Sequence, residues 1–396
     1  MIGKKKLPIR ILFPFVGDTI GGSHLSTLEL IKGLDRNEFE PIVAIHQDGM
    51  LISYLKENRI QFVYVKGEMR RKDIVKCHKI NTILYLIHCR LYLISHIIFL
   101  HKSQIEIVHT NDSRMHSIWG ITARIAGIKY VRHQRTYLSS KYLKKGKIKL
   151  SSKIRFLIPN IILTISNYCM SGLPDDLRDK TKVIVNPFNV DMGDIDSHYW
   201  KKKIVNELNL SDGISIVGFV ANLIEQKRPI FFVQVADNII KAGYNNVVFL
   251  IFGELREPMV TSVKKVIYNN NMNERCFLMG SRFPIEPYMA TFDVLISPAI
   301  NEGFGRTLVE SMLVGTPVVA ADDGGHKEII QHGTTGLLVQ PDDSHAFAEA
   351  VMYLLDNPTV SKRMSGAARN WAMENCSVAK HVKKIQGVYK ELLHCV

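Results

Sequence analysis

Short apolar runs alternate with longer stretches of helical spacing along the whole chain. Runs rich in β-branched and aromatic residues that end at turn-forming residues predict buried strands. In the first half, the expected strands are Ile9–Phe15, Ile42–Ile45, Phe62–Val65, Ile105–His109, Tyr130–Arg132 and Ile161–Ile165. The pattern restarts in the second half with Ser215–Val220, Val247–Gly253, Phe277–Gly280, Val294–Ser297, Pro317–Ala320 and Gly336–Val339. Strands separated by helices form parallel sheets, so we expect an α/β protein of two doubly wound, Rossmann-like domains.

The turn-rich segment Asn186–Asn189 and the polar stretch Asp191–Lys203 indicate the boundary between the two domains. We therefore expect an N-terminal domain over residues 1–188 and a C-terminal domain over residues 189–375. In the tail, apolar residues recur at helical spacing, which predicts a helix over Val378–Leu393. We expect this last segment, residues 376–396, to return to the N-terminal domain.

Length and charge narrow the class of protein. A chain of 396 residues is too long for one ordinary α/β domain. Its 51 Lys and Arg against 37 Asp and Glu give a formal net charge of +14, which favours anionic partners such as phosphates or an anionic membrane. A basic nucleic-acid-binding protein is the alternative from another class. The chain has no helix-turn-helix, zinc or aromatic RNA-binding signature, so we expect no nucleic acid.

An apolar stretch in the first half, Ile80–Leu100, raises the question of a membrane. Asn81, His88, Arg90 and His96 interrupt it, so we expect no spanning helix. One interpretation is a crossover helix packed on the first sheet. The other is an amphipathic helix lying at an anionic membrane, assisted by the basic clusters Arg70–Lys79 and Lys141–Lys153. The N-terminus does not have the pattern of a signal peptide. We expect a cytoplasmic protein able to meet the inner face of the membrane.

The segment Leu295–Glu310 carries the clearest chemistry. A buried strand ends at Ser297, a loop with Gly303 and Gly305 follows, and a helix begins near Gly305. The glycines allow close approach of the backbone to a ligand, and N–H groups at the start of a helix bind anions. Doubly wound folds bind nucleotides at such a position, the carboxyl end of a parallel strand.

Two carboxylates, Glu302 and Glu310, flank this loop and could bracket an extended ligand. Paired carboxylates also serve glycoside hydrolysis. The phosphate-type loop between them favours a nucleotide-dependent enzyme, because a glycoside hydrolase needs no nucleotide.

This segment resembles the E-x7-E motif of retaining GT-B glycosyltransferases, specifically the large family 4. The resemblance covers most of the chain and extends to Phe15–His24, Ile107–Thr110, Val183–Asn186, Val217–Arg228 and Met279–Arg282. It implies transfer of a sugar from a nucleotide-sugar donor to an acceptor hydroxyl with retention of configuration. It also implies that the domain over residues 1–188 binds the acceptor, that the domain over residues 189–375 binds the donor, and that the two domains face each other across a cleft. The setting it implies is assembly of a cell-surface polysaccharide or a lipid-linked glycan. A nucleotide-sugar epimerase or hydrolase on the same fold is the alternative among enzymes.

The resemblance also implies roles for single residues. Glu310 would accept hydrogen bonds from the donor ribose, Glu302 would hold sugar hydroxyls near the reacting centre, and Lys227 would neutralise the leaving diphosphate. The remaining residues expected at the substrate are Gly21, Gly22, Asn222, Arg228, Arg282, Phe283, Gly303, Phe304, Gly305, Arg306 and Thr307.

The chain departs from the family at Asn222, where the family has an arginine. Arg228 or Arg306 could supply the missing charge, or the Asn222 amide could itself bind the phosphate. His133 follows a predicted strand and matches the family's histidine near the reacting sugar. It would orient the sugar or the acceptor as a neutral ring or as a charged donor, unless it is a structural loop residue.

The sequence does not support a metal site. Asp194 and Asp196 have the D-x-D spacing with which transferases of another fold hold a divalent cation on a diphosphate. They lie in the presumed connector, away from any donor loop. We therefore expect a metal-independent enzyme with no cofactor, whose nucleotide sugar is a substrate.

Overall fold

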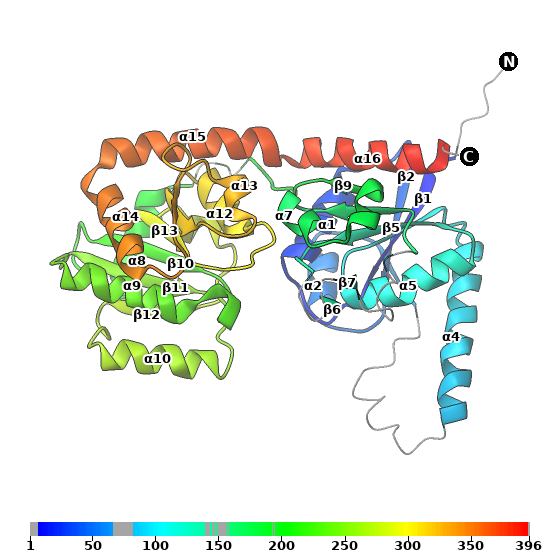
Figure 1. Ribbon diagram of the computed structural model, residues 1–396, viewed down its shortest axis with the longest axis horizontal. Helices are drawn as coiled ribbons and strands as arrows, with labels where there is room; N and C mark the ends of the chain where they lie inside the picture. The colour runs from blue at the N-terminus through cyan, green and yellow to red at the C-terminus, as the bar shows by residue number, and fades with distance from the viewer. Residues whose placement is uncertain are drawn as a thin grey trace. The chain divides into compact units, whose positions relative to one another are not determined.

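The chain forms two compact units in the computed structural model (Figure 1). The structure describes residues 7–65, 82–138, 158–191 and 195–394, together with residues 143–144, 147–148, 156 and 193. The first unit comprises Met1–Pro187 and Val378–Val396, and the second comprises Phe188–Ser377. The C-terminal helix therefore belongs to the first unit.

The described part of the first unit contains a seven-stranded sheet in which every neighbouring pair is parallel. Its strand order is β3 (Phe62–Tyr64), β2 (Phe39–Ile45), β1 (Ile9–Phe15), β4 (Ile107–Thr110), β5 (Lys129–Gln134), β8 (Ile161–Thr164) and β9 (Thr181–Val183). The six predicted strands are confirmed. The sequence pattern did not predict a short hairpin of β6 (Leu143–Lys144) and β7 (Lys147–Ile148).

Alternate residues of the central strand β1 face two apolar layers. Ile11, Phe13 and Phe15 belong to one buried cluster, and Leu12 belongs to another on the opposite side of the sheet. The first cluster is completed by residues of α1 (Gly22–Gly33), α2 (Met50–Glu57) and α16 (Val378–His394). The second is completed by residues of α4 (Thr82–Lys102) and α5 (Ser113–Ile125). The shorter helices of this unit are α7 (Asn167–Ser171) and the 3-10 helix η3 (Asp175–Lys180).

The C-terminal helix α16 packs on α1 at close range. A Cβ atom added to Gly33 would lie 2.7 Å from Cγ2 of Val382, so glycine makes this contact feasible. Val382, Ile385, Val388 and Tyr389 are all buried in the first cluster. The helical spacing read from the sequence therefore marks the face of α16 that covers the first sheet.

The described part of the second unit contains a six-stranded parallel sheet, and all six of its predicted strands are confirmed. Its order is β12 (Cys276–Gly280), β11 (Val247–Phe252), β10 (Ser215–Val220), β13 (Val294–Ser297), β14 (Val318–Ala321) and β15 (Leu337–Val339). Chain order reverses between β10 and β13, as it does between β1 and β4 in the first unit. Both sheets are thus doubly wound, and each has a switch point at this reversal.

Helices link the strands of the second unit. They are α8 (Ser197–Glu207), η4 (Glu225–Lys227), α9 (Pro229–Lys241), α10 (Met259–Asn269), α11 (Glu286–Met289), α12 (Arg306–Leu313), α13 (His326–Ile329), α14 (Ser344–Asp356) and α15 (Pro358–Cys376). A buried apolar cluster joins β10, β11 and β13 to α9, α10 and α14. On β10, Gly218 admits the ring of Phe292, because an added Cβ would lie 2.2 Å from that ring.

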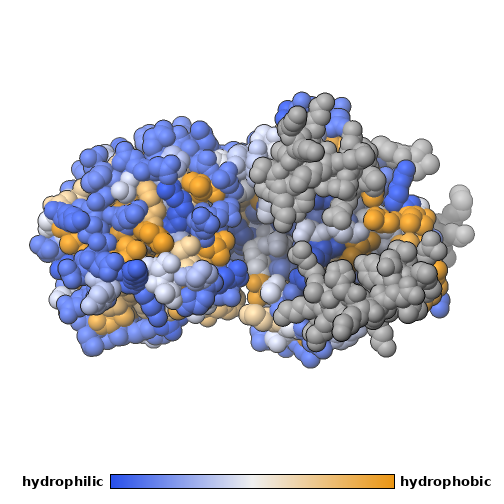
Figure 2. All heavy atoms as spheres, turned by 60° about the horizontal axis from the view of Figure 1, so that its bottom comes forward, coloured by the Kyte–Doolittle hydropathy of each residue, from blue (hydrophilic) through white to orange (hydrophobic). Residues whose placement is uncertain are grey.

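Helix α4 exposes apolar side chains in the part that the structure describes. Leu91, Ile94 and Ile98 are 59%, 52% and 46% exposed, whereas His96 and Leu100 are buried. These three apolar side chains therefore face away from the sheet, and Figure 2 shows apolar surface in the region where α4 lies. None of the described helices is long and apolar enough to cross a membrane. The basic residues of Arg70–Lys79, and the side chains of the lysines in Lys141–Lys153, lie outside the described residues.

Candidate functional site

Two loops of the second unit flank the switch point of its sheet. One follows β10 and contains Asn222 and Lys227, and the other follows β13 and contains Glu302. Since all the strands run parallel, both loops leave the same edge of the sheet, and the reversal of chain order opens a crevice between them. The topology thus brings together residues that are 75 positions apart in the sequence.

Lys227 and Glu302 form an ion pair at this edge, with Nζ of Lys227 donating to Oε2 of Glu302. Both side chains are partly exposed, at 27% and 18%. Backbone and amide bonds hold the two loops together: Gln226 Nε2 donates to Asn301 O at 3.0 Å, and Ile300 N donates to Gln226 O at 3.2 Å. The pair is therefore supported by its loops and remains open to solvent.

The glycine loop continues directly from Glu302 into α12. Gly305 has a φ of +102°, which a side chain would strain, and it precedes the first helical residue, Arg306. No side chain caps α12, whereas Asp112 caps α5 and Asp343 caps α14. First-turn N–H groups of a helix have no intrahelical acceptor, and the helix dipole favours an anion there. The start of α12 has these properties, and Thr307 lies in its first turn.

A second pair of glycines, Gly324 and Gly325, supports this loop from the end of β14. Gly325 N donates to the Glu302 carbonyl at 2.8 Å, and a Cβ added to Gly325 would lie 2.6 Å from the Gly303 carbonyl oxygen. Only glycine permits so close an approach. The sequence analysis did not single out these residues, although a Gly-Gly pair after a buried strand is a usable signal.

His326 follows them and was also missed. Its side chain is fully buried, and a Cβ added to Gly305 would lie 3.1 Å from its Cδ2. Burial lowers the pKa of His326, although Glu302 acts in the opposite direction. The ring is therefore neutral, and Nδ1 donates to the Ala321 carbonyl at 3.2 Å.

The second carboxylate, Glu310, lies one helical turn beyond Arg306. Arg306 donates to Glu310 at 3.0 Å, and its guanidinium lies 4.3 Å from the ring centroid of Phe188. Burial raises the pKa of Glu310, an effect that the charge of Arg306 opposes. Phe304, also in the loop, is buried. The positive charge of Arg306 is thus directed to Glu310 rather than to Asn222.

The other residues that were predicted at the donor site make their contacts with different partners. Asn222 Oδ1 accepts from the Glu254 amide at 3.2 Å, joining the loops after β10 and β11. Arg228 donates to the Pro341 carbonyl and pairs with Asp342 at 2.6 Å. Arg282 pairs with Glu207 of α8 at 2.6 Å, and Phe283 is 82% exposed. The structure does not bring Arg228 or Arg282 to the Lys227–Glu302 pair.

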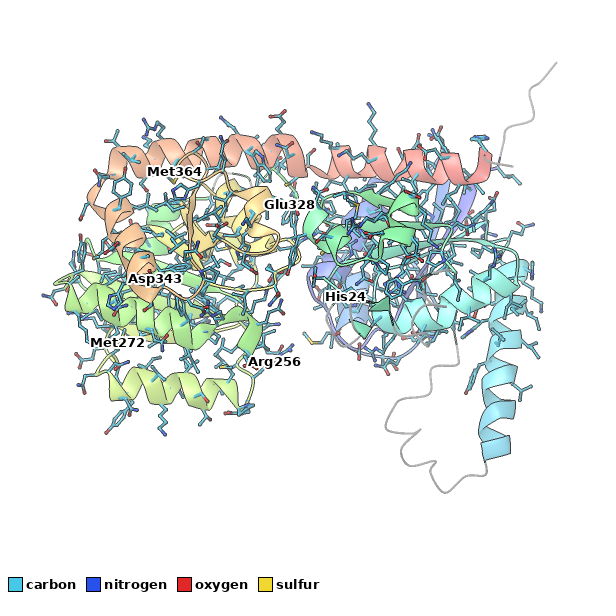
Figure 3. The ribbon with its side chains drawn as sticks, in the orientation of Figure 1. His24, Arg256, Met272, Glu328, Asp343 and Met364 are labelled. Carbon is cyan, nitrogen blue, oxygen red and sulfur yellow. The ribbon has the colours of Figure 1, made fainter. Side chains whose placement is uncertain are left out.

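In the first unit, Gly21 and Gly22 form the entry to α1. Gly21 is exposed, with an extended φ of −159°, and its N–H donates to Nδ1 of His24 at 3.1 Å. Figure 3 labels His24 among the side chains of the first unit. Burial lowers the pKa of His24, although Asp112 raises it. Because Gly21 and Gly22 follow β1, they lie at the carboxyl edge of the first sheet.

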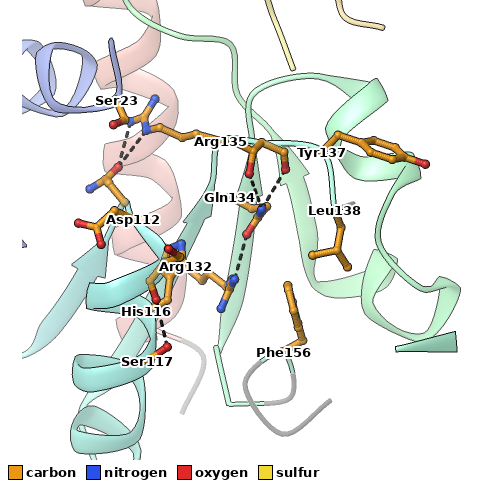
Figure 4. A pocket seen from close by; sticks show the side chains of 13 residues that line it. Ser23, Asp112, His116, Ser117, Arg132, Gln134, Arg135, Tyr137, Leu138 and Phe156 are labelled. Atoms are coloured by element: carbon orange, nitrogen blue, oxygen red, sulfur yellow. Dashed lines mark hydrogen bonds between the residues drawn. The ribbon is translucent and has the colours of Figure 1, made fainter. Parts of the chain in front are cut away.

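A cavity of about 320 Å³ lies at the same edge of the first sheet (Figure 4). Its wall comes from the loop after β4, the first turn of α5, the end of β5 and the segment beyond it. The lining residues are Ser23, Asn111, Asp112, Ser113, His116, Ser117, Arg132, Gln134, Arg135, Thr136, Tyr137, Leu138 and Phe156. Burial, and after it the charge of nearby Arg132, lower the pKa of His116. The sequence analysis assigned none of these residues to a site.

His133 does not line this cavity. It lies in β5, fully buried, and its ring stacks on those of His109 and His381. Arg135, which does line the cavity, donates to Nδ1 of His133 at 3.3 Å. His133 is thus a buried strand residue, and the residues on either side of it in the sequence line the cavity.

Comparison with known proteins fits this geometry. Residues 201–371 match the model of the family described as glycosyl transferases group 1. Over 94% of this chain and 97% of the relative, the sequence is 25% identical to UDP-Gal:alpha-D-GlcNAc-diphosphoundecaprenol alpha-1,3-galactosyltransferase of Escherichia coli. The chain is a glycosyltransferase, and its second unit carries the match to the group 1 family.

Solved structures show the same fold across nearly the whole chain. Anabaena HepE in complex with UDP-glucose superposes with a TM-score of 0.79 at 19% identity, covering 97% of this chain and 100% of HepE. Sucrose-phosphate synthase of Thermosynechococcus elongatus gives a TM-score of 0.75 at 15% identity, covering 98% and 100%. The two doubly wound units are those of the GT-B fold, which is confirmed.

The contact between Gly325 and the glycine loop yields a test. Replacing Gly325 with Ala forces the loop at Gly303 to move, because the new Cβ would overlap its carbonyl. We expect roughly tenfold weaker binding of whichever nucleoside diphosphate the wild-type protein binds best in a panel of UDP, GDP and ADP, measured by calorimetry, with the far-UV spectrum unchanged. Gly366→Ala is the control, since an added Cβ there meets no atom within 4 Å. Equal affinity for that nucleotide in the two variants would contradict the assignment of this loop to the ligand.

Proposed function

We propose that this protein transfers a sugar from a nucleotide-sugar donor to a hydroxyl of an acceptor glycan or lipid-linked saccharide. One observation carries the proposal. The Lys227–Glu302 pair and the glycine-bounded start of α12 meet at the switch point of the second sheet. This arrangement places a cation, a carboxylate and helix N–H groups where doubly wound folds bind nucleotides. HepE, which shares the fold, was solved with UDP-glucose bound.

Lys227 would act on the leaving diphosphate. Transfer concentrates negative charge on the diphosphate as the glycosidic bond breaks, and a fixed cation lowers the barrier by stabilising that charge. In the structure, Lys227 pairs with Glu302. Diphosphate would draw Lys227 away from this carboxylate, which could then accept hydrogen bonds from hydroxyls of the donor sugar.

Glu310 would bind the donor ribose. Its carboxylate is held by Arg306 and largely shielded from water. A carboxylate in such a place is a strong acceptor for a pair of sugar hydroxyls. The amides of Gly303, Phe304 and Gly305, with Arg306 and Thr307, would complete the contacts to sugar and diphosphate.

We further propose retention of configuration at the reacting carbon. Glu302, the carboxylate at the proposed sugar site, is paired with Lys227 and is assigned to sugar hydroxyls. The proposal therefore does not use Glu302 as a covalent nucleophile. The acceptor hydroxyl would attack on the face that the diphosphate leaves, and an oxygen of the departing diphosphate would take its proton.

The acceptor would bind the first unit. Its cavity lies at the carboxyl edge of a doubly wound sheet and is lined by hydroxyl, amide and guanidinium groups. Such groups suit a hydroxyl-rich or anionic ligand. The Escherichia coli relative is named for an acceptor that carries a diphosphate-linked lipid. We propose an acceptor of the same general kind, used in cell-surface glycan assembly.

No metal ion or cofactor is needed in this proposal. Lys227 and the start of α12 supply the positive potential that a divalent cation supplies in other transferases. The described residues contain no group of three His, Cys, Asp or Glu side chains able to hold a metal. Of the D-x-D pair, Asp196 caps α8 by accepting from Tyr199 N at 2.9 Å, and Asp194 lies outside the described residues.

Contact with the membrane is the last part of the proposal. The apolar stripe of α4 faces solvent at Leu91, Ile94 and Ile98, and Lys102 follows at the end of the helix. With the net charge of +14, this favours peripheral binding to an anionic membrane. Such binding would place the enzyme beside a lipid-linked acceptor at the inner face of the membrane.

Replacing the two carboxylates should separate donor binding from turnover. Glu310→Gln removes a charged ribose acceptor, and we expect donor binding to weaken roughly 10- to 100-fold. Glu302→Gln should lower kcat about 100-fold with a smaller effect on donor affinity. Transfer is measured with a panel of nucleotide sugars and glycan acceptors. Unchanged kinetics in both variants would refute the donor site, and sugar release that does not depend on acceptor would indicate a hydrolase.

Metal independence predicts that transfer persists in excess EDTA. The measurement compares initial rates with EDTA, with EDTA followed by excess magnesium or manganese, and with neither. We expect equal rates, whereas Lys227→Ala should lower kcat about 100-fold or more because the diphosphate loses its cation. A rate abolished by EDTA and restored by either metal would contradict the prediction.

Membrane binding should depend on the stripe of α4. We expect co-sedimentation with vesicles containing anionic lipid, weakening as salt rises because the charges are screened within about 8 Å at physiological ionic strength. Ile94→Gln should reduce binding about fivefold, from roughly 1 kcal/mol of lost apolar burial. Ile125→Gln, at a similarly exposed isoleucine of α5, is the control. Equal binding to neutral and anionic vesicles, or equal loss in both variants, would count against the proposal.

A further inference from the structure

The chain enters the second unit at Phe188, a residue of the turn-rich boundary segment. Its N–H donates to the carbonyl of Cys376 at 2.8 Å, and it pairs in parallel with Ser377, the last residue of the unit. Cys376 ends α15, and α15 packs against α12. Phe188 is only 2% exposed. Its backbone is therefore fixed to the framework of the second unit, and its ring is enclosed.

The ring of Phe188 lies against the glycine loop on both sides of Gly305. The guanidinium of Arg306 lies 4.3 Å from the ring centroid of Phe188. The ring of Phe304 lies 6.3 Å from it between centroids, with 26° between the two planes. Gly305 has no side chain to pack, and its φ is +102°. One aromatic ring thus supports the two residues that flank the most permissive backbone position of the loop.

Arg306 connects this ring to the buried carboxylate of the loop. While its guanidinium faces the ring of Phe188, it donates to Oε1 of Glu310 at 3.0 Å. A guanidinium can do both, because it stacks on a ring through its flat face and donates from its edge. Fixing an arginine side chain costs rotamer entropy, which attraction to an aromatic face offsets. The stack therefore holds the cation in one place beside Glu310.

We propose that Phe188 is a positioning residue for the donor, which holds Arg306 on Glu310 and fixes the glycine loop around Gly305. The inference rests on the proposed function, in which this loop binds sugar and diphosphate and Glu310 binds the ribose. Without the ring, Arg306 would leave Glu310 more often, and the donor itself would have to order the loop at a cost in affinity. Phe188 thus acts through Arg306 and Phe304, and the sequence gave no sign of it beyond a turn.

The link between Phe188 and Glu310 is measured first, without any ligand. Burial raises the pKa of Glu310, the charge of Arg306 lowers it, and Glu286 of α11 raises it. Phe188→Leu weakens the hold on Arg306, so we expect Glu310 to titrate at a higher pH in the variant than in wild type. Carbon-13 spectra of the full chain labelled at the glutamate carboxyls follow this titration, and Glu310→Gln assigns the signal. The same titration in both proteins would overturn the inference whatever the enzyme transfers.

Nucleotide binding tests the effect on the donor site. The probe is whichever of UDP, GDP and ADP the wild-type protein binds best, and we expect Phe188→Leu to weaken its binding about tenfold in calorimetry. Phe249→Leu is the matched control. Phe249 of β11 is fully buried and meets the ring of Phe232 within the apolar cluster of that sheet, so the same ring is lost away from the loop. Equal losses of affinity in the two variants would reduce Phe188 to a packing residue and overturn the proposal.

Fluorinated phenylalanines at Phe188 test the stack itself. Fluorine withdraws electrons from the face of the ring and weakens its attraction for a guanidinium, whereas the apolar packing changes little. We expect nucleotide affinity to fall stepwise as one, two and three fluorines are added, by about fivefold in all. An affinity that does not change along the series would overturn the role of the stack.

Failure of the inference and failure of the proposed function are distinguishable. If nucleotide binds and Glu310→Gln weakens it but Phe188→Leu does not, the donor site stands and the inference fails. If Glu310 responds to Phe188→Leu as expected but wild-type protein binds none of the three nucleotides and transfers no sugar, the proposed function fails and the positioning of Arg306 stands.

Discussion

Parallel pairing of the strands on either side of the switch point is the constraint on which the rest of the structure depends. In the second unit β10 pairs with β13, and in the first unit β1 pairs with β4. Parallel strands share a carboxyl edge, and the loops on either side of the reversal diverge to opposite faces of the sheet. Lys227 and Glu302 meet there. In the first unit, Gly21 and the cavity-lining Asp112 occupy the equivalent edge.

Charge pairing organises the second unit's site. Lys227 pairs with Glu302, Arg306 with Glu310, and Arg228 with Asp342. The two pairs that flank the glycine loop have similar exposure: Lys227 and Glu302 are 27% and 18% exposed, and Arg306 and Glu310 are 22% and 14% exposed. Burial raises the pKa of Glu310, an effect that the charge of Arg306 opposes.

Glycines have a different role, because they determine how closely two backbone segments can approach each other. Gly325 lets the loop after β14 support the Glu302 loop, and Gly305 adopts a left-handed conformation beside the ring of His326. In the first unit, support comes from side chains instead. His109 of β4 contacts both Tyr389 of α16 and His133 of β5, so the last helix of the chain is joined to the first sheet by buried hydrogen bonds.

The sequence by itself determined the two sheets, because strand-forming runs and the turns between them are local signals that burial enforces along the chain. It also located the loop from Glu302 to Glu310, since glycines and carboxylates at the end of a strand have few other uses. Only the tertiary structure decided which charges meet. Arg228 and Arg306 looked interchangeable as partners for a phosphate, yet one pairs with Asp342 and the other with Glu310, 114 and four positions away. His326 and the Tyr389–His109–His133 line were likewise invisible, because their contacts join segments that only the packing of sheets and helices brings together.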